Sequence, residues 1–472
     1  MYKFMKNIFK VLFSNIISLL SGILVGFLVP KMMGLVGYAN YKTYTLYLTY
    51  IALLSLGLGD GLYLRFSGID KEELDVNQIK YYLHKYYLQL FLIFLPAFVI
   101  SIFVVPVEQK FICVALSFTI LSSQITAVHQ NLSVITSRFN EYSTRVIVKA
   151  SLTSIFVIVL YLIYKIQGAE ITYQIYIIGV MFIDFLLAFW YLYTYKEFNF
   201  GKVDRNYVLE ESYWHLLRLG FPLLISNMAG SIFLNFDRQF VSILFEKEDY
   251  AIYAFAYNML TLITTMTSAV SLVLFPALRK IKNLDVKTGL NRYIKCFNMI
   301  VALCLIVFFP LCWIVSIFLP KYESSLEVFR IVLPGLIFSS SVSVILNNFY
   351  KYENKVQRYF IGTVSAIGFS VILNFAAYYM WGTYLSISWV SMIALIYWYF
   401  ISYLYFIKKY KVPFTINFLY IISISIAFYI ITTVIENWVM ASVMYLAAYI
   451  IITILFNYSV IMEMKNKIIC KE

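Results

Sequence analysis

Long apolar runs recur along the whole chain, and their length constrains its fold more than any other feature. A helix that crosses the hydrocarbon of a bilayer needs about 20 mostly apolar residues. Of the 472 residues, 62% are hydrophobic and only 13% are charged, whereas a soluble domain has about 25% charged residues and needs a polar surface. The chain is therefore predicted to be an all-α, multi-pass membrane protein, which excludes a soluble enzyme, a secreted disulfide scaffold and a disordered chain.

About fourteen transmembrane helices are expected. The runs lie at residues 9–30, 41–63, 82–105, 111–133, 146–164, 172–195, 216–237, 250–275, 297–319, 329–350, 359–380, 383–407, 415–435 and 439–462. When the connections are assigned alternately to the two sides, 29 of the 37 Lys and Arg residues fall on one side. Because basic residues accumulate in cytoplasmic loops, both termini are predicted to be cytoplasmic. The net charge of +13 is explained in this way, and no nucleic acid partner is expected.

The two halves of the chain repeat each other weakly. An offset of 212 residues brings the first two predicted spans onto the seventh and eighth without a gap: Ser14-Asn15 corresponds to Ser226-Asn227, and Tyr38-Ala39 to Tyr250-Ala251. Six spans per repeat give both halves the same orientation, so two parallel six-helix lobes with the substrate path between them are predicted. The expected domains are an amino-terminal lobe at 1–195, a charged linker at 196–215, a carboxy-terminal lobe at 216–410, and an appended helix pair with a tail at 411–472.

The sequence lacks the motifs of common catalytic sites. It has no P-loop, no nucleophile elbow and no paired-histidine metalloprotease motif. The three histidines are far apart in sequence, and the five cysteines form no CxxC pair. We therefore predict no catalytic residue, no metal site and no cofactor.

Ionisable residues at membrane depth are the best functional candidates, because they are costly there and usually face a bundle interior or a wet cavity. Four cations, Lys31, Lys42, Arg238 and Arg330, fall at the predicted extracytoplasmic ends of spans. The bias of basic residues toward the cytoplasmic side makes idle cations unusual at those ends. A group of cations there suits an anionic ligand. The alternative is that these side chains simply extend to the lipid headgroups.

Carboxylates and amides accompany these cations. Asp237 precedes Arg238 and either neutralises it or titrates as a coupling group, and Asp60 closes the second predicted span. Asp184 lies in an apolar stretch, so it needs a partner or a proton, and a structural hydrogen bond and a proton-relay role both remain open. Asn15 and Asn227 occupy equivalent positions of the repeat and either link helices or contact a sugar.

Two stretches of the chain resemble a known family. The first stretch begins with Val29-Pro30-Lys31, continues with Gly34, Gly37-Tyr38-Ala39 and Tyr41, and ends with Leu56-Gly57-Leu58-Gly59-Asp60-Gly61 and Arg65-Phe66. The second stretch is Asp237-Arg238, followed by Phe245 and by Tyr250-Ala251-Ile252-Tyr253-Ala254. They resemble the beginnings of the two halves of polysaccharide-transporter proteins. This is the Wzx-like group of O-antigen and capsule repeat-unit flippases, within the multidrug/oligosaccharidyl-lipid/polysaccharide exporter superfamily.

The resemblance implies a function and a site. It implies a flippase in the bacterial cytoplasmic membrane that moves undecaprenyl-diphosphate-linked oligosaccharide from the inner to the outer leaflet for surface polysaccharide assembly. Besides this substrate and membrane lipid, its implied partners are a polysaccharide polymerase and other assembly proteins. The family's cation-lined cavity, carried over by position, points to Lys31, Lys42, Arg65 and Arg238. The first predicted span has few arginines, which leaves the identity of the diphosphate-binding residues open.

Two other functions are compatible with a multi-pass chain. A cation-coupled multidrug exporter would favour carboxylates and aromatic rings at its site, whereas the extracytoplasmic excess here is cationic. A membrane-embedded polysaccharide polymerase or ligase typically needs a long extracytoplasmic loop, and the longest such loop predicted here has about a dozen residues. Both alternatives are therefore ranked below a flippase.

Overall fold

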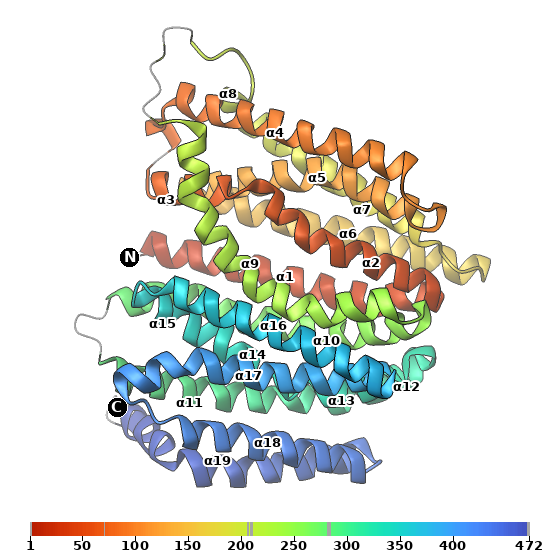
Figure 1. The fold of residues 1–472 in the computed structure, drawn as a ribbon, viewed down its shortest axis with the longest axis vertical. Helices are drawn as coiled ribbons and strands as arrows, with labels where there is room; N and C mark the ends of the chain where they lie inside the picture. The colour runs from red at the N-terminus through yellow and green to blue at the C-terminus, as the bar shows by residue number, and fades with distance from the viewer. Residues whose placement is uncertain (1, 70, 205–206, 208–210, 281–284, 470–472) are drawn as a thin grey trace. The chain divides into compact units, whose positions relative to one another are not determined.

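The computed structural model describes residues 2–69, 71–204, 207, 211–280 and 285–469, and within them the chain forms helices and no strand (Figure 1). The predicted all-α fold is confirmed. The helices are α1 (Tyr2–Met32), α2 (Leu35–Ile51), η1 (Ala52–Ser55), α3 (Leu58–Phe66), η2 (Lys71–Glu73), α4 (Val76–Phe103), α5 (Val107–Ile135), α6 (Phe139–Gln167), α7 (Tyr173–Thr194), α8 (Lys196–Asn199), α9 (Tyr213–Leu244), α10 (Lys247–Lys280), α11 (Val286–Cys304), η3 (Leu305–Val307), α12 (Phe308–Phe318), η4 (Pro320–Tyr322), α13 (Ser325–Val332), α14 (Gly335–Ser340), η5 (Ser341–Leu346), α15 (Asn347–Tyr352), α16 (Val356–Trp381), α17 (Tyr384–Tyr410), α18 (Phe414–Val434) and α19 (Trp438–Ile469).

The helices have the length and composition of membrane spans. In the described part of the chain, 11 are long and apolar enough to cross a bilayer, and the number rises to 13 if each of two bent helix pairs is one span. The chain is a multi-pass membrane protein. The predicted count of fourteen and the cytoplasmic location of both termini stay predictions. The predicted span at 250–275 coincides with the 34-residue helix α10, some of whose side chains lie outside the described residues.

Two of the predicted spans are bent by more than 40°. The span predicted at 41–63 is divided between α2 and α3, which meet at a bend of 52°. The chain turns there through Leu56 and Gly57, whose φ angles of 49° and 89° lie in the left-handed region. A Cβ atom on Gly57 would come within 2.5 Å of the backbone nitrogen of Phe221, so only glycine fits this turn. The span predicted at 329–350 bends by 48° between residues 325–332 and 335–352, at Pro334, which lacks the N–H of a regular helix.

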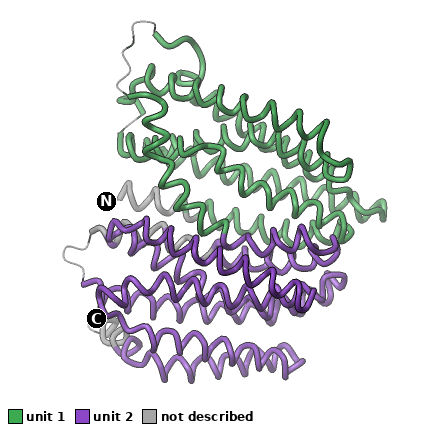
Figure 2. Tube along the Cα trace, viewed as in Figure 1, with its two compact units in different colours: residues 1–232 green, residues 233–472 purple. Residues whose placement is uncertain are grey.

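The chain divides into two compact units, residues 1–232 and residues 233–472, and the boundary between them falls inside α9 (Figure 2). We call these unit 1 and unit 2. The lobe and linker boundaries expected from the sequence stay a prediction, and residues 205–206 and 208–210 of the expected linker lie outside the described ones.

Buried tyrosines with hydrogen-bonded hydroxyl groups occur in both units. In unit 1, the hydroxyl of Tyr86 donates to the side-chain oxygen of Gln124 at 2.8 Å. In unit 2, Tyr350 donates to the carbonyl oxygen of Ser402, also at 2.8 Å. A tyrosine supplies a large apolar ring and a polar end that is satisfied by a neighbouring helix. Tyrosines such as Tyr86 and Tyr350 therefore serve as core residues in both units.

Candidate functional site

A cavity of about 500 Å³ lies within unit 1, between α1, α2, α5, α6 and α7. We call it the unit 1 cavity. Its volume falls in the range of roughly 300–1,000 Å³ that is typical of small-molecule sites. Of its 18 lining residues, 12 carry a polar group: the hydroxyl-bearing Ser18, Ser21, Thr126, Thr153, Tyr41, Tyr142, Tyr176 and Tyr191, the amides Asn15 and Gln130, and the cations Arg145 and Lys149.

Small residues of α1 shape the wall of the unit 1 cavity. The hydroxyl of Ser21 donates to the carbonyl oxygen of Ala150 at 3.0 Å and accepts from the hydroxyl of Ser154 at 2.9 Å, so α1 is held directly against α6. Beside Ser21, Gly22 has no side chain with which to fill the space, and it lines the cavity. The serine and glycine therefore fix the position of α1 and leave the volume open.

Two cations enter the unit 1 cavity from one face of α6. Arg145 and Lys149 are four residues apart, which places them one turn apart on the same side of the helix. The ammonium group of Lys149 lies 2.7 Å from a carboxylate oxygen of Asp184 on α7. Among the described lining residues, no side chain carries a carboxylate, so the walls present positive charge and hydrogen-bond donors.

Arg145 is the most deeply buried of these charges, with 3% of its surface exposed. Its guanidinium group lies over the rings of Tyr191 and Trp190, at 4.1 Å and 4.9 Å from their centroids. One terminal nitrogen donates to the hydroxyl of Thr194 at 2.6 Å, and the other lies 3.6 Å from the carboxylate of Glu141. Its Nε is buried and has no hydrogen-bond partner within the described part of the chain. The side chain is thus held rigidly and keeps one donor unused.

The site residues predicted in the first half of the chain lie in several different places. Asn15 lines the unit 1 cavity, and Asp184 reaches it through its ion pair with Lys149. The ammonium group of Lys42 lies 5.2 Å from the centroid of the Tyr41 ring, which forms part of the cavity wall.

Three other predicted residues of unit 1 are not among the residues that line this cavity. Lys31 lies in the last turn of α1. Asp60 lies in the first turn of α3. Arg65 lies in the last turn of α3, with its Nε 3.1 Å from a carboxylate oxygen of Glu211.

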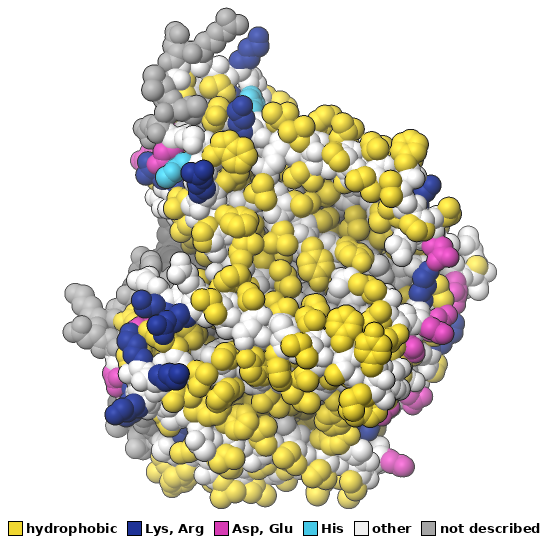
Figure 3. Space-filling model, viewed as in Figure 1, with side chains coloured by type: hydrophobic (Ala, Val, Ile, Leu, Met, Phe, Trp, Pro, Cys, Tyr) yellow, Lys and Arg dark blue, Asp and Glu magenta, His cyan; other side chains and the backbone are white. Residues whose placement is uncertain are grey.

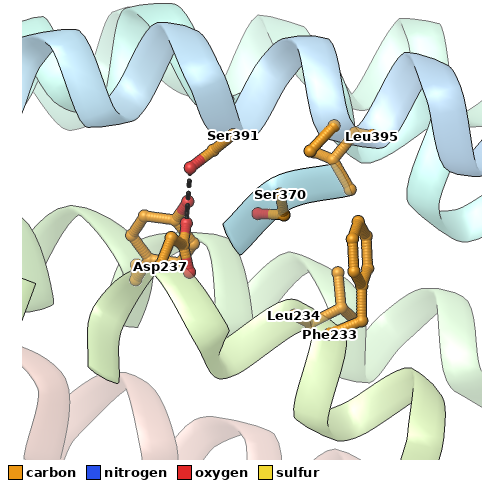
Figure 4. A pocket seen from close by; sticks show the side chains of 8 residues that line it. Phe233, Leu234, Asp237, Ser370, Ser391 and Leu395 are labelled. Atoms are coloured by element: carbon orange, nitrogen blue, oxygen red, sulfur yellow. Dashed lines mark hydrogen bonds between the residues drawn. The ribbon is translucent and has the colours of Figure 1, made fainter. Parts of the chain in front are cut away.

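The residues predicted in the second half lie on α9. Asp237 is buried beside a cavity of only about 30 Å³, the unit 2 cavity. Figure 4 shows its carboxylate facing Ser391 of α17, whose hydroxyl donates to it at 2.8 Å. Tyr253 also donates to this carboxylate, at 3.0 Å, as does Tyr257.

The other two predicted residues of α9 lie outside the unit 2 cavity lining. The backbone N–H of Arg238 donates to Asp237 at 2.8 Å, and its guanidinium group lies 5.2 Å from the centroid of the Tyr257 ring. Asn227, the repeat partner of Asn15, is exposed on α9.

Sequence reasoning missed Arg145 and Gln130 as candidates. The predicted span began at residue 146, which assigned Arg145 to a cytoplasmic connection, whereas α6 begins at Phe139. The available signal was the spacing of Tyr142, Arg145 and Lys149, which places three polar side chains along one helix face. Gln130 gave no comparable signal, because its exposure to a cavity depends on how α5 packs against α1 and α6.

The fold defines a class of protein: a multi-pass, all-helical membrane protein. The chain belongs to the polysaccharide biosynthesis protein family, whose sequence profile matches residues 4–282. The match begins in α1 and ends just after α10, and it confirms the family resemblance of the sequence. A search of curated protein sequences gives no match.

Solved structures with the same fold are transporters and flippases. The lipid II flippase MurJ in an inward closed conformation has a TM-score of 0.69 at 16% identity, and the similarity covers 97% of this chain and 100% of that one. An inward-facing multidrug resistance transporter of the MATE family has a TM-score of 0.55 at 15% identity, covering 84% and 94%. A MOP superfamily transporter from Pyrococcus furiosus has a TM-score of 0.54 at 13% identity, covering 86% and 97%. The chain therefore shares its fold with membrane transporters and flippases.

Proposed function

We propose that this protein is a flippase for undecaprenyl-diphosphate-linked oligosaccharide repeat units, which it moves by alternating access from the inner to the outer leaflet of the bacterial cytoplasmic membrane. A charged sugar headgroup cannot cross about 30 Å of hydrocarbon unaided. The observation that carries the proposal is the unit 1 cavity, which combines two cations with amide and hydroxyl groups in about 500 Å³. Family membership supports a role in polysaccharide assembly.

The cations of the cavity are assigned to the diphosphate. A guanidinium group presents paired donors that match phosphate oxygens, and a hydrogen bond to a charged group contributes about 1.5–3 kcal/mol. The buried Nε–H of Arg145 has no acceptor in the described part of the chain. Lys149 is paired with Asp184, and a phosphate can compete for it. In this proposal, the arriving diphosphate replaces Asp184 as the partner of Lys149.

The neutral polar groups are assigned to the sugars. Asn15 and Gln130 each provide an amide that can donate and accept, and both line the same cavity. Lys31, Lys42, Arg65, Arg238 and Asn227 remain proposed substrate contacts, and Asp60, Asp184 and Asp237 remain proposed coupling or charge-pair residues. Membrane lipid, a polysaccharide polymerase and other assembly proteins are the proposed partners.

Multidrug export is the second candidate, because proteins of the MATE family share the fold. The chemistry of the unit 1 cavity disfavours it. A cationic drug would meet Arg145 and Lys149 at the wall, with Asp184 already occupied by Lys149. Like charges that lose solvent on binding repel one another strongly.

The proposal is tested in a strain that lacks the gene. Complementation with the wild-type chain restores surface polysaccharide, whereas Arg145→Gln leaves lipid-linked oligosaccharide on the cytoplasmic leaflet. We expect at least about a tenfold loss of flipping, since losing about 1.4 kcal/mol of binding to the transported state suffices. Lys165→Gln is the matched control, because Lys165 is an exposed cation in the last turn of the same helix. If the intermediate reaches the outer leaflet normally in the deletion strain and is merely not polymerised, the flippase function is wrong.

A further inference from the structure

A basic groove lies at one end of unit 2, where α16 begins and α17 ends. It has a volume of about 390 Å³ and is lined by Lys355, Arg358, Tyr405, Lys408 and Lys409. Figure 3 shows Lys and Arg side chains gathered at the edge of unit 2 where Figure 1 labels α15. The charge pattern of the sequence predicts that this end is cytoplasmic. A solvated loop would also be basic there, so the contacts of each cation decide whether the groove is a site.

One of the four cations is neutralised by the protein itself. Lys409 lies 2.5 Å from a carboxylate oxygen of Glu353, to which Tyr405 and Tyr410 also donate, at 3.1 Å and 2.5 Å. Burial alone would raise the pKa of Glu353, but the hydrogen bonds from Lys409, Tyr410 and Tyr405 outweigh it and hold the pKa below its ordinary value. Glu353 is therefore ionised, and one of its carboxylate oxygens, Oε2, is the partner of Lys409, Tyr405 and Tyr410.

The remaining three cations of the groove are uncompensated. Within the described part of the chain, no carboxylate pairs with Lys355, Arg358 or Lys408. Arg358 is nonetheless held in place, because its guanidinium group lies 5.0 Å from the centroid of the Tyr405 ring. The ring restrains the cation and leaves its hydrogen-bond donors free.

The two helices that form the groove expose apolar side chains further along their length. Ile361 and Val364 of α16 are 65% and 47% exposed, and Phe400 of α17 is 41% exposed. Both helices are long and apolar enough to cross a membrane, so these side chains belong to the surface that faces lipid. The groove thus lies at one end of two helices with the composition of membrane spans, and a ligand with an anionic head and an apolar tail would fit it.

We propose that the basic groove binds the phosphate headgroup of a membrane lipid. A guanidinium group and two ammonium groups together match the oxygens of a phosphate, and basic pockets between membrane helices on the cytoplasmic side recognise anionic lipid headgroups. The same chemistry fits two sources, an anionic glycerophospholipid of the leaflet and the diphosphate of a polyprenyl lipid. The proposal does not depend on the transported substrate, because it concerns unit 2 and leaves the unit 1 cavity unchanged.

The test measures bound lipid on the purified full-length protein. After delipidation, the protein is mixed with phosphatidylglycerol in detergent micelles, and the fraction that carries lipid is counted by native mass spectrometry. We expect the variant K355Q/R358Q/K408Q to bind at least about tenfold more weakly than wild type, since each cation near an anionic surface contributes about a fivefold factor. The matched control is K80Q/K85Q/K202Q, which removes the same charge from the predicted cytoplasmic side of unit 1.

The outcomes distinguish binding of the lipid in the groove from a general effect of the protein's positive charge. Retained binding by the control, together with loss by the groove variant, supports the site. Equal loss in both variants, or none in the groove variant, overturns it. If soluble pyrophosphate displaces the lipid, the groove prefers a diphosphate headgroup. If the lipid stays bound, the groove prefers the headgroup of the glycerophospholipid. If the triple variant does not elute as a folded protein, Lys408→Gln against Lys85→Gln gives the same comparison, because both side chains are exposed.

Discussion

In each unit a cavity lies beside equivalent residues of the repeated helices α1 and α9, and the two cavities differ more than tenfold in volume: about 500 Å³ in unit 1 and about 30 Å³ in unit 2. In unit 1 the wall is open and cationic, whereas in unit 2 it closes around a carboxylate. At the offset of 212 residues, the corresponding positions are Ser21 and Phe233, Gly22 and Leu234, Val25 and Asp237, and Tyr41 and Tyr253.

Side-chain size explains the difference in volume. Where α1 has a serine and a glycine, α9 has a phenylalanine and a leucine, which fill the space between the helices. The hydrogen-bond partners of the charged side chains explain why the two cavities differ in chemistry. Asp237 receives hydrogen bonds from several hydroxyl groups of its own unit, whereas Arg145 keeps a buried donor without a partner in the described chain. In the proposed function, this position contributes to a ligand site in unit 1, whereas in unit 2 the same position makes a structural contact.

The largest effect is expected from making unit 1 resemble unit 2. Gly22→Leu introduces the side chain that unit 2 carries at the equivalent position, Leu234. Its isobutyl group occupies the unit 1 cavity, so we expect flipping to be abolished, a loss of about a hundredfold or more that corresponds to about 2.7 kcal/mol. The measurement is the distribution of lipid-linked oligosaccharide between leaflets in the complemented deletion strain.

The control for this prediction is Gly22→Ala. A methyl group takes up little of the cavity and raises helix propensity by about 1 kcal/mol, so transport and thermal stability are both expected to be kept. Full activity of Gly22→Leu, with normal membrane levels of the protein, would show that the unit 1 cavity is not on the transport path.

The sequence predicts the spans well because hydropathy over about 20 residues is a local property. It predicts the break at Gly57 less well, since the requirement for glycine comes from the backbone of Phe221, which is distant in sequence. Arg145 was missed for a related reason: the apolar run starts later than α6 does, so a cation that lines the cavity was assigned to a connection between helices. The sequence gives the 212-residue offset of the repeat. It does not give the size of the cavity, because that depends on how α1 packs against α6.

The second prediction concerns how each unit holds its buried carboxylate. Asp184 in unit 1 is ion-paired with Lys149, whose side chain is 48% exposed. Lys149→Met removes this cation and leaves a poorly solvated charge. We expect a loss of about 2–3 kcal/mol in the free energy of unfolding, below the about 3–5 kcal/mol for a fully buried pair, because Lys149 is half exposed. Thermal unfolding of the purified protein in detergent measures it.

The double variant K149M/D184N sharpens this test. Removing the carboxylate together with its partner should restore most of the stability, because no uncompensated charge remains. If the double variant is as unstable as Lys149→Met, the ion pair is not what stabilises this part of unit 1.

The third prediction enlarges the unit 2 cavity. Leu234→Ala removes part of the side chain that fills the position equivalent to Gly22. Large-to-small changes of leucine cost about 2–5 kcal/mol, and a value of about 2 kcal/mol is expected here because Leu234 is only half-buried. Flipping by the protein that remains folded should be unchanged, since the larger cavity gains no cation. A change in flipping per folded molecule would contradict the division of roles between the two cavities.

The smallest effect is expected at Ser391. Ser391→Ala deletes one of the hydroxyl groups that donate to Asp237, but Tyr253, Tyr257 and the backbone of Arg238 remain as donors. We therefore expect a loss of about 1 kcal/mol, below the usual value for a hydrogen bond to a charged group, seen as a small decrease in the midpoint of thermal unfolding. Tyr397→Phe is the control, because it removes a hydroxyl bonded to Ser365 in the same unit and away from the carboxylate. A loss from Ser391→Ala as large as that from Lys149→Met would mean that Asp237 depends on a single partner, as Asp184 does, and the two units would then hold their buried carboxylates in the same way.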